Sequence, residues 1–230
     1  MKLKRVAKKL LFTTACILAA ALLVIAAAFF RQAYINSEIN DNYAIVSSNP
    51  IYQAPVSVQG LRFTKQKISC GYAIIEMISD WQGKMVTEQS LFEGNNGTIS
   101  TAMGEGFLKE IKKQFPGWEI TRYKNLKNSE LLCVMHEALA KGMPVVIEFA
   151  ALYEAGGVKT WTLHFAVVTA MDLRNDSIIV QNPYGYEESY TVDSFLNATR
   201  YDSYDNMEAA FSFGFAFGLF NKNTIYTIQE

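Results

Sequence analysis

The spacing of hydrophobic residues changes along the chain, from a helical period in its first part to a strand period in its second. Beyond residue 60, apolar residues recur every three or four positions in four segments that predict helices: 69–82, 87–92, 101–114 and 129–141. Short apolar or alternating runs between turn residues predict strands: 118–123, 144–150, 163–172, 177–183, 188–192, 211–220 and 224–229. Helices followed by closely connected strands are typical of an α+β fold, with N-terminal helices packed on a C-terminal antiparallel sheet.

The segment 211–220 contains an unusual run of aromatic residues. Phenylalanine occupies every second position from Phe211 to Phe217. Side chains alternate between the two faces of a strand, so this period predicts a strand with one face buried in the core. A strip that faces lipid or a partner is the alternative interpretation.

The N-terminal segment differs from the rest because it is both long and uncharged. Residues 10–30 are 21 positions without a charge, which as a helix would span about 31 Å, close to the ~30 Å hydrocarbon core of a bilayer. Five basic residues precede it, and such clusters tend to stay in the cytoplasm. We therefore expect a basic cytoplasmic tail (1–9), a transmembrane anchor (10–30), a linker and extended lead-in (31–58) and one domain outside the cytoplasm (59–230). A cleaved signal segment, which would give a secreted protein, is the alternative.

Charge agrees with this division. The chain has 21 basic and 22 acidic residues, and six of the basic residues but no acidic residue lie within 1–31. The remainder therefore carries 15 basic and 22 acidic residues, a net charge of −7. Proteins that bind nucleic acid need a basic surface, so the balance argues against a nucleic-acid partner.

Three polar residues, far apart in the sequence, could meet at one site. Cys70 opens the helix predicted for 69–82, with Ser69 as its candidate N-cap, and the positive end of a helix dipole favours a thiolate. His164 lies at the start of one predicted strand, and Asn182 ends the next. Neighbouring antiparallel strands can place these two side by side, so that the amide oxygen fixes the tautomer of the imidazole while the other ring nitrogen faces Cys70.

The order of the motifs resembles that of papain-like cysteine peptidases. It is most similar to the bacterial double-glycine-leader (bacteriocin-processing) peptidases and their exported relatives, over about residues 60–197. The matching segments are Gln66, "CGYAIIEMI", "KGMPVVIEF", "LHFAVVTAMD" and "QNPYGYEESYTVDSF". The resemblance implies that Cys70 is the nucleophile, that His164 is the general base and acid, and that Asn182 orients His164. It also implies an oxyanion hole formed by Gln66 and the backbone N–H of Cys70, although Gln66 lies closer to the cysteine than its counterpart in the family does.

We therefore expect a membrane-tethered extracytoplasmic cysteine peptidase that cleaves peptide or amide bonds through a thioester, acts on a peptide or protein, and needs no cofactor or metal. A non-catalytic peptide-binding domain on the same scaffold is one alternative. An acyltransferase or isopeptidase that acts on cell-envelope peptides is a second, and a structural protein held by a Cys70–Cys133 disulfide is a third. We expect His136, in the middle of a predicted helix, to be structural.

Overall fold

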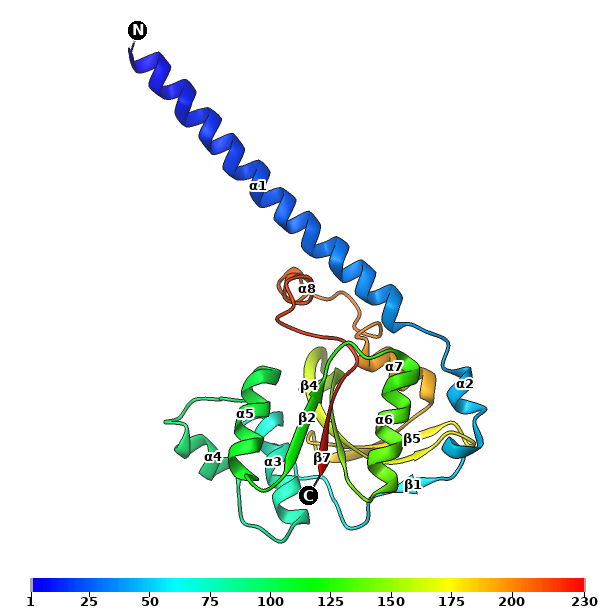
Figure 1. The fold of residues 1–230 in the computed structure, drawn as a ribbon. Coiled ribbons are helices and arrows are strands. Elements are labelled where there is room, and N and C mark those ends of the chain that lie inside the picture. Colours follow the sequence, from blue (N-terminus) through cyan, green and yellow to red (C-terminus); the bar gives the residue numbers. More distant parts are fainter. Residues whose placement is uncertain (1, 230) are drawn as a thin grey trace.

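A single long helix projects from a folded body in this computed structural model, which describes residues 2–229 (Figure 1). This helix, α1 (Lys2–Ile39), is the one helix within 2–229 whose length and composition would allow it to cross a membrane. It continues through residues 31–39, where a linker was expected, and its last residue, Ile39, is buried against the body. The segment after the apolar run is therefore helical rather than extended.

The body contains short helices around one sheet. The helices are α2 (Ala44–Ser47), α3 (Cys70–Trp81), α4 (Glu88–Gly94), α5 (Gly104–Gln114), α6 (Asn128–Ala140), α7 (Val192–Thr199) and α8 (Ala209–Ala216), with a 3₁₀ turn at Pro50–Tyr52. The strands are β1 (Val56–Ser57), β2 (Glu119–Tyr123), β3 (Val145–Ala155), β4 (Val158–Asp172), β5 (Ser177–Asn182), β6 (Tyr186–Tyr190) and β7 (Thr224–Gln229). Helices dominate the first part and strands the second, which confirms the predicted α+β class.

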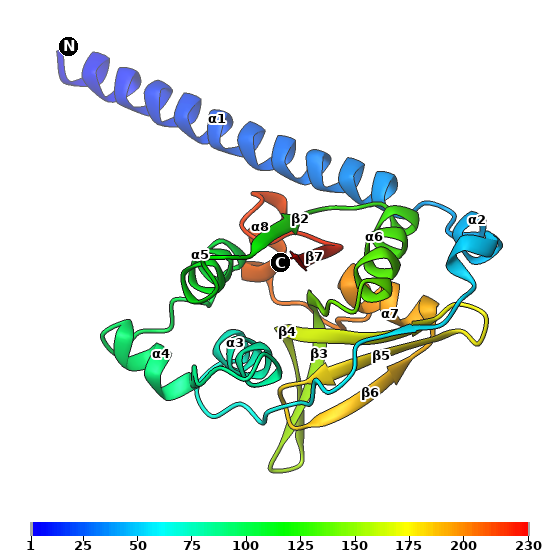
Figure 2. The ribbon, with the colours of Figure 1, turned by 60° about the horizontal axis from the view of Figure 1, so that its bottom comes forward.

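The sheet is antiparallel throughout the described residues, in the order β2-β7-β3-β4-β5-β6, and β1 adds to β4. Helix α6 packs against β3, β4 and β7, whereas α7 packs against β3, β5 and β6. Helices α3, α4 and α5 form a group at one side of the sheet (Figure 2). The predicted arrangement of N-terminal helices on a C-terminal antiparallel sheet is confirmed.

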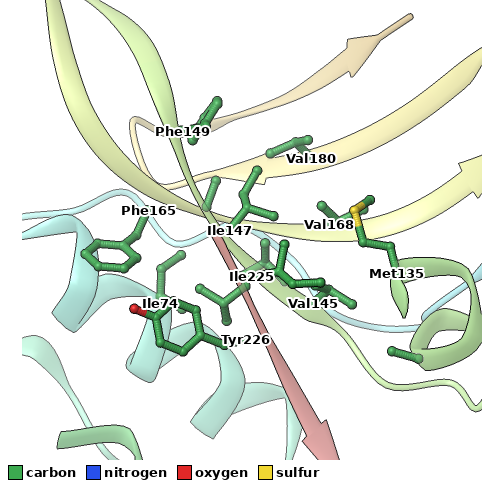
Figure 3. Packing of buried hydrophobic residues seen from close by; sticks show 14 of the residues in the cluster. Ile74, Met135, Val145, Ile147, Phe149, Phe165, Val168, Val180, Ile225 and Tyr226 are labelled. Atoms are coloured by element: carbon green, nitrogen blue, oxygen red, sulfur yellow. The ribbon is translucent and has the colours of Figure 1, made fainter. Parts of the chain in front are cut away.

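The core lies where α3 and α6 meet the central strands. Val145, Val146 and Ile147 are consecutive in β3 and all 0% exposed. Because successive side chains point to opposite faces, this strand is covered on both sides. Figure 3 shows Ile74 of α3 and Met135 of α6 among the side chains of the sheet. The elements α3, β4 and β5, which carry Cys70, His164 and Asn182, thus share one continuous hydrophobic cluster.

The segment 211–220 is not the strand that its alternating phenylalanines predicted. Its first part forms α8, and residues 217–220 form a turn. Two residues correspond to about 200° of rotation on a helix, so the phenylalanines fall alternately on opposite faces of α8 instead of sharing one face as on a strand. Phe215 faces inward with 4% exposure, whereas Phe213 and Phe217 face outward with 41% and 47%. Because the segment is helical, the alternating phenylalanines are divided between the inward and outward faces.

Candidate active site

Cys70 is the first residue of α3. The side chain of Ser69 caps the helix and accepts a hydrogen bond from the backbone N–H of Tyr72 at 3.2 Å, as the sequence predicted. The next residue, Gly71, packs so tightly that a Cβ there would lie 2.5 Å from Cβ of Thr101. The glycine after the cysteine therefore lets the start of α3 approach the loop that carries Thr101.

A buried carboxylate holds the backbone that leads into Cys70. Glu88, 2% exposed, accepts hydrogen bonds from the backbone N–H groups of Lys67 (2.8 Å), Ile68 (2.8 Å) and Ser69 (3.0 Å). Hydrogen bonds to a charged acceptor are stronger than neutral ones. We therefore assign Glu88 a role in positioning the loop before the cysteine, which the sequence analysis missed because an acidic residue in the first turn of a helix is common.

His164 and Asn182 are brought together by the pairing of β4 with β5. Nε2 of His164 lies 3.0 Å from Oδ1 of Asn182, and both residues are buried. Oδ1 also accepts from the backbone N–H of Tyr184 at 2.9 Å, while Nδ2 donates to Glu188 at 2.7 Å. These partners fix the orientation of the amide, so Nε2 carries the proton in this bond and Nδ1 of the neutral ring is the basic nitrogen.

An aromatic side chain covers the histidine. The ring of Tyr184 stacks on that of His164, with 4.0 Å between centroids and 20° between planes. Its hydroxyl lies 2.7 Å from the hydroxyl of Thr162, which holds the ring in place. The sequence analysis did not identify this contact, although an aromatic residue two positions after Asn182 was a visible signal.

Cys70 and His164 line the same cavity, whose volume is about 80 Å³. The cavity is lined by three separate parts of the chain. Its lining includes the start of α3 and the loop before α5, strands β3 and β4, and the C-terminal residues Tyr201 and Phe220. No hydrogen bond between the thiol and the imidazole occurs in the described part of the chain, so the structure places the two in one cavity without joining them directly.

The charge states of both groups are governed by burial. Burial raises the pKa of the Cys70 thiol above its ordinary value, although the backbone N–H groups of Phe165, Gly71 and Cys70 act in the opposite direction. Burial lowers the pKa of His164 to about 4, against the effect of its hydrogen bond with Asn182. These shifts favour a neutral thiol and a neutral imidazole at neutral pH, because burial has the largest effect on both groups.

A buried ion pair forms the far wall of the cavity. Glu148 of β3 lines the cavity and accepts hydrogen bonds from Arg122 at 2.8 Å and from the hydroxyl of Tyr226. Burial raises the pKa of Glu148, while Arg122 acts to lower it. Because Arg122 and Tyr226 hold its carboxyl group in place, Glu148 contributes structure to the wall of the cavity.

The remaining sequence-based candidates occupy different positions. The backbone N–H of Gln66 donates to the carbonyl of Pro183 at 2.7 Å, beside the turn that follows Asn182, and its Oε1 is buried without a hydrogen-bond partner. Cys70 and Cys133 are both free thiols, which removes the disulfide alternative. His136 lies 3.0 Å from the carbonyl of Ala54 and packs edge-on against Tyr52, as expected of a structural histidine. Within residues 2–229, no group of three or more His, Cys, Asp or Glu side chains could hold a metal ion.

The sequence matches the Peptidase_C39 like family over residues 37–210, about three quarters of the chain. The chain belongs to this family. Membership supports a cysteine peptidase domain for this C39-like protein, and the matched region contains Gln66, Cys70, His164 and Asn182.

Two solved structures are similar to the C39-like protein at low sequence identity. One is the peptidase domain of Streptococcus ComA, described as a bifunctional ABC transporter involved in a quorum-sensing pathway; it is 13% identical, with a TM-score of 0.46, over 74% of this chain and 98% of that one. The other is a double glycine motif protease from an AMS/PCAT transporter in complex with the leader peptide; it is 12% identical, with a TM-score of 0.47, over 77% and 99%. No curated protein matches the sequence.

Proposed function

We propose that the C39-like protein is a membrane-tethered, extracytoplasmic cysteine peptidase in which Cys70, His164 and Asn182 form the catalytic triad. The observation that carries this proposal is the pairing of His164 with Asn182 on the wall of the cavity that Cys70 also lines. The hydrogen bond uses Nε2, so Nδ1 is the nitrogen that remains to accept the proton of the thiol.

The reaction is acyl transfer through a thioester. His164 accepts the proton of Cys70, the sulfur attacks the peptide carbonyl, and the protonated ring then gives its proton to the leaving amine. His164 next removes a proton from water, which cleaves the thioester to release the acid and regenerate the thiol. The backbone N–H of Cys70 and the amide of Gln66 would stabilise the oxyanion, and such a donor contributes about 3–4 kcal/mol to the transition state.

The tether is the apolar part of α1. Its side chains from Leu11 to Phe30 are mostly exposed in the structure, which fits a helix surrounded by lipid. The basic residues before it would remain in the cytoplasm, so the peptidase domain would lie on the other side. A peptide or protein outside the cytoplasm is then the substrate.

The test compares the full chain with its Cys70→Ala variant on a mixture of peptides, with cleavage followed by mass spectrometry. The expected loss of rate is about 10⁴-fold or more, because the variant has no nucleophile. Cys133→Ala is the matched control, since Cys133 packs on the hydrophobic cluster of α6 outside the cavity and its loss should leave cleavage intact. A folded Cys70→Ala variant that cleaves as fast as the native chain contradicts the mechanism, and transfer of the acyl group to an added amine would indicate an acyltransferase instead.

A further inference from the structure

The outward face of the C-terminal helix α8 is apolar and exposed. Phe213 and Phe217 are 41% and 47% exposed, and Leu219, in the turn that follows, is 60% exposed. Large apolar side chains that gather on the surface of a domain usually mark a contact with a partner or with lipid. We call these three residues the aromatic patch. They have no role in the proposed catalytic mechanism.

The aromatic patch lies beside the candidate membrane helix. The ring of Phe213 packs edge-on against that of Phe29 in α1, with 5.3 Å between their centroids. Gly218 approaches the guanidinium of Arg31, which is the first charged residue after the apolar run. Both views show α8 between α1 and the sheet (Figures 1 and 2). The patch is therefore level with the residues at which the apolar segment of α1 ends.

The end of the apolar segment of α1, and the aromatic patch beside it, would lie at the surface of a bilayer. If residues 10–30 span the hydrocarbon core, then Phe29 and Phe30 lie at its outer boundary and Arg31 lies among the headgroups. A helix that is apolar on all sides is expected in a protein core or in lipid. Phe211 and Phe215 of α8 pack on the folded body and Phe213 packs on Phe29 of α1, whereas Phe217 is 47% exposed.

We propose that the aromatic patch is a second membrane contact, by which α8 inserts at the outer surface of the bilayer next to α1. The partner is the lipid surface itself, and the argument for lipid is the continuity of the patch with Phe29 of the apolar run. This inference rests on the proposed tether, because without a spanning α1 nothing would bring the patch to the bilayer.

The patch is also connected to the catalytic cavity. Phe220, which lines the cavity, packs against Phe215 with 5.6 Å between ring centroids, and its ring would collide with a Cβ at Gly214. The membrane-facing helix and one wall of the cavity thus belong to the same ten-residue segment, 211–220. A bilayer contact at α8 would therefore hold the cavity close to the membrane surface.

The experiment measures whether the patch touches acyl chains. The full chain is reconstituted in phosphatidylcholine vesicles with and without brominated acyl chains, which quench tryptophan at close range. The variants are Phe217→Trp in the patch, Leu18→Trp within the apolar run as a positive control, and Met85→Trp as a negative control. Met85 is 92% exposed in the loop between α3 and α4, and both views show these two helices away from α1. The unsubstituted chain gives the background from the three native tryptophans.

We expect the added fluorescence of Phe217→Trp to be quenched to an extent comparable with Leu18→Trp, and that of Met85→Trp to be unaffected. Quenching of Leu18→Trp but not of Phe217→Trp overturns the membrane contact and leaves the tether intact. If neither is quenched, the tether and the contact are both wrong. If Phe217→Trp is unquenched by lipid but shows contact between copies in cross-linking, the patch is a dimer interface instead.

Discussion

Replacing Asn182 by aspartate tests the hydrogen-bond network that orients His164. The native amide uses both of its ends, because Oδ1 accepts from His164 and Tyr184 while Nδ2 donates to Glu188 at 2.7 Å. The variant Asn182→Asp keeps the acceptor toward the ring but turns the donor into a second carboxylate oxygen. Two carboxylates then face each other where one hydrogen bond existed.

The magnitude follows from Coulomb's law. Two unit charges that relax to about 4 Å near a protein surface repel each other by about 4 kcal/mol. Glu188 is half-buried, so solvent reduces the repulsion, and protonation of one carboxyl limits it further. We therefore expect Asn182→Asp to lower the free energy of unfolding by about 2–4 kcal/mol at pH 7.

The assay is urea unfolding of the full chain in detergent, followed by tryptophan fluorescence, for the native chain, Asn182→Asp, Glu188→Gln and the double variant. The amide that replaces Glu188 can donate to the new carboxylate, so the double variant should regain most of the loss. A carboxyl pair whose folded pKa is raised contributes stability that is present at low pH and is lost as the pH rises, so the deficit of Asn182→Asp should shrink toward pH 4. Equal stability of the single variant and the native chain at pH 7, or additive effects in the double variant, would refute the placement of Asn182 against Glu188.

Two further predictions concern stability. Burial lowers the pKa of His164 from 6.5 to about 4, so the native chain should keep its full stability above pH 6.5 and lose about 3 kcal/mol as the pH falls from 6.5 through 4. The His164→Gln variant should lack this part of the pH dependence. Identical profiles of unfolding free energy against pH for the two proteins would contradict the prediction. Gly71→Ala should lower the free energy of unfolding by about 1–3 kcal/mol, because its Cβ would lie 2.5 Å from Thr101, whereas Gly94→Ala, with no atom within 4 Å, should be neutral or stabilising; equal effects at the two glycines would show that the close approach is absent.

Local patterns were sufficient to predict most of the fold. The helical period of "CGYAIIEMISDW" and the cap at Ser69 predicted α3 almost to the residue, since both signals lie within the helix itself. The short turn between β4 and β5 predicted that His164 and Asn182 lie on neighbouring strands. Helix α7 was missed, and the helix at 211–216 was predicted as a strand, because in short segments the periodicity does not separate helix from strand.

The part of the site that escaped prediction depends on contacts between distant segments. Glu88 follows Cys70 by 18 positions and is separated from it by the whole of α3, so nothing nearby indicates that it holds the backbone of residues 67–69. The same holds for Phe220, which lines the cavity but belongs to the aromatic run 211–220, where nothing in the sequence indicates a link to the site. Residue type and order were sufficient to propose Cys70, His164 and Asn182 as the site, whereas they gave no indication of the residues that position and cover these three.

The cavity that Cys70 and His164 line is small, and burial there shifts the pKa of both groups. At about 80 Å³ it is far below the ~300 Å³ or more of typical ligand pockets. Cys70 itself is partly exposed, but one wall would have to move for the cavity to enclose part of a peptide. The walls from α3 and β4 belong to the main core, whereas the C-terminal wall is held by a separate small cluster around Tyr201 and Phe215. Tyr201 has φ 61°, an uncommon backbone conformation for an aromatic residue, at the start of that wall. Movement of this wall would admit water together with substrate and would relieve the burial that raises the pKa of Cys70 and lowers that of His164. Opening the cavity and activating the thiol would then be one event, governed by the segment whose outer face carries the aromatic patch.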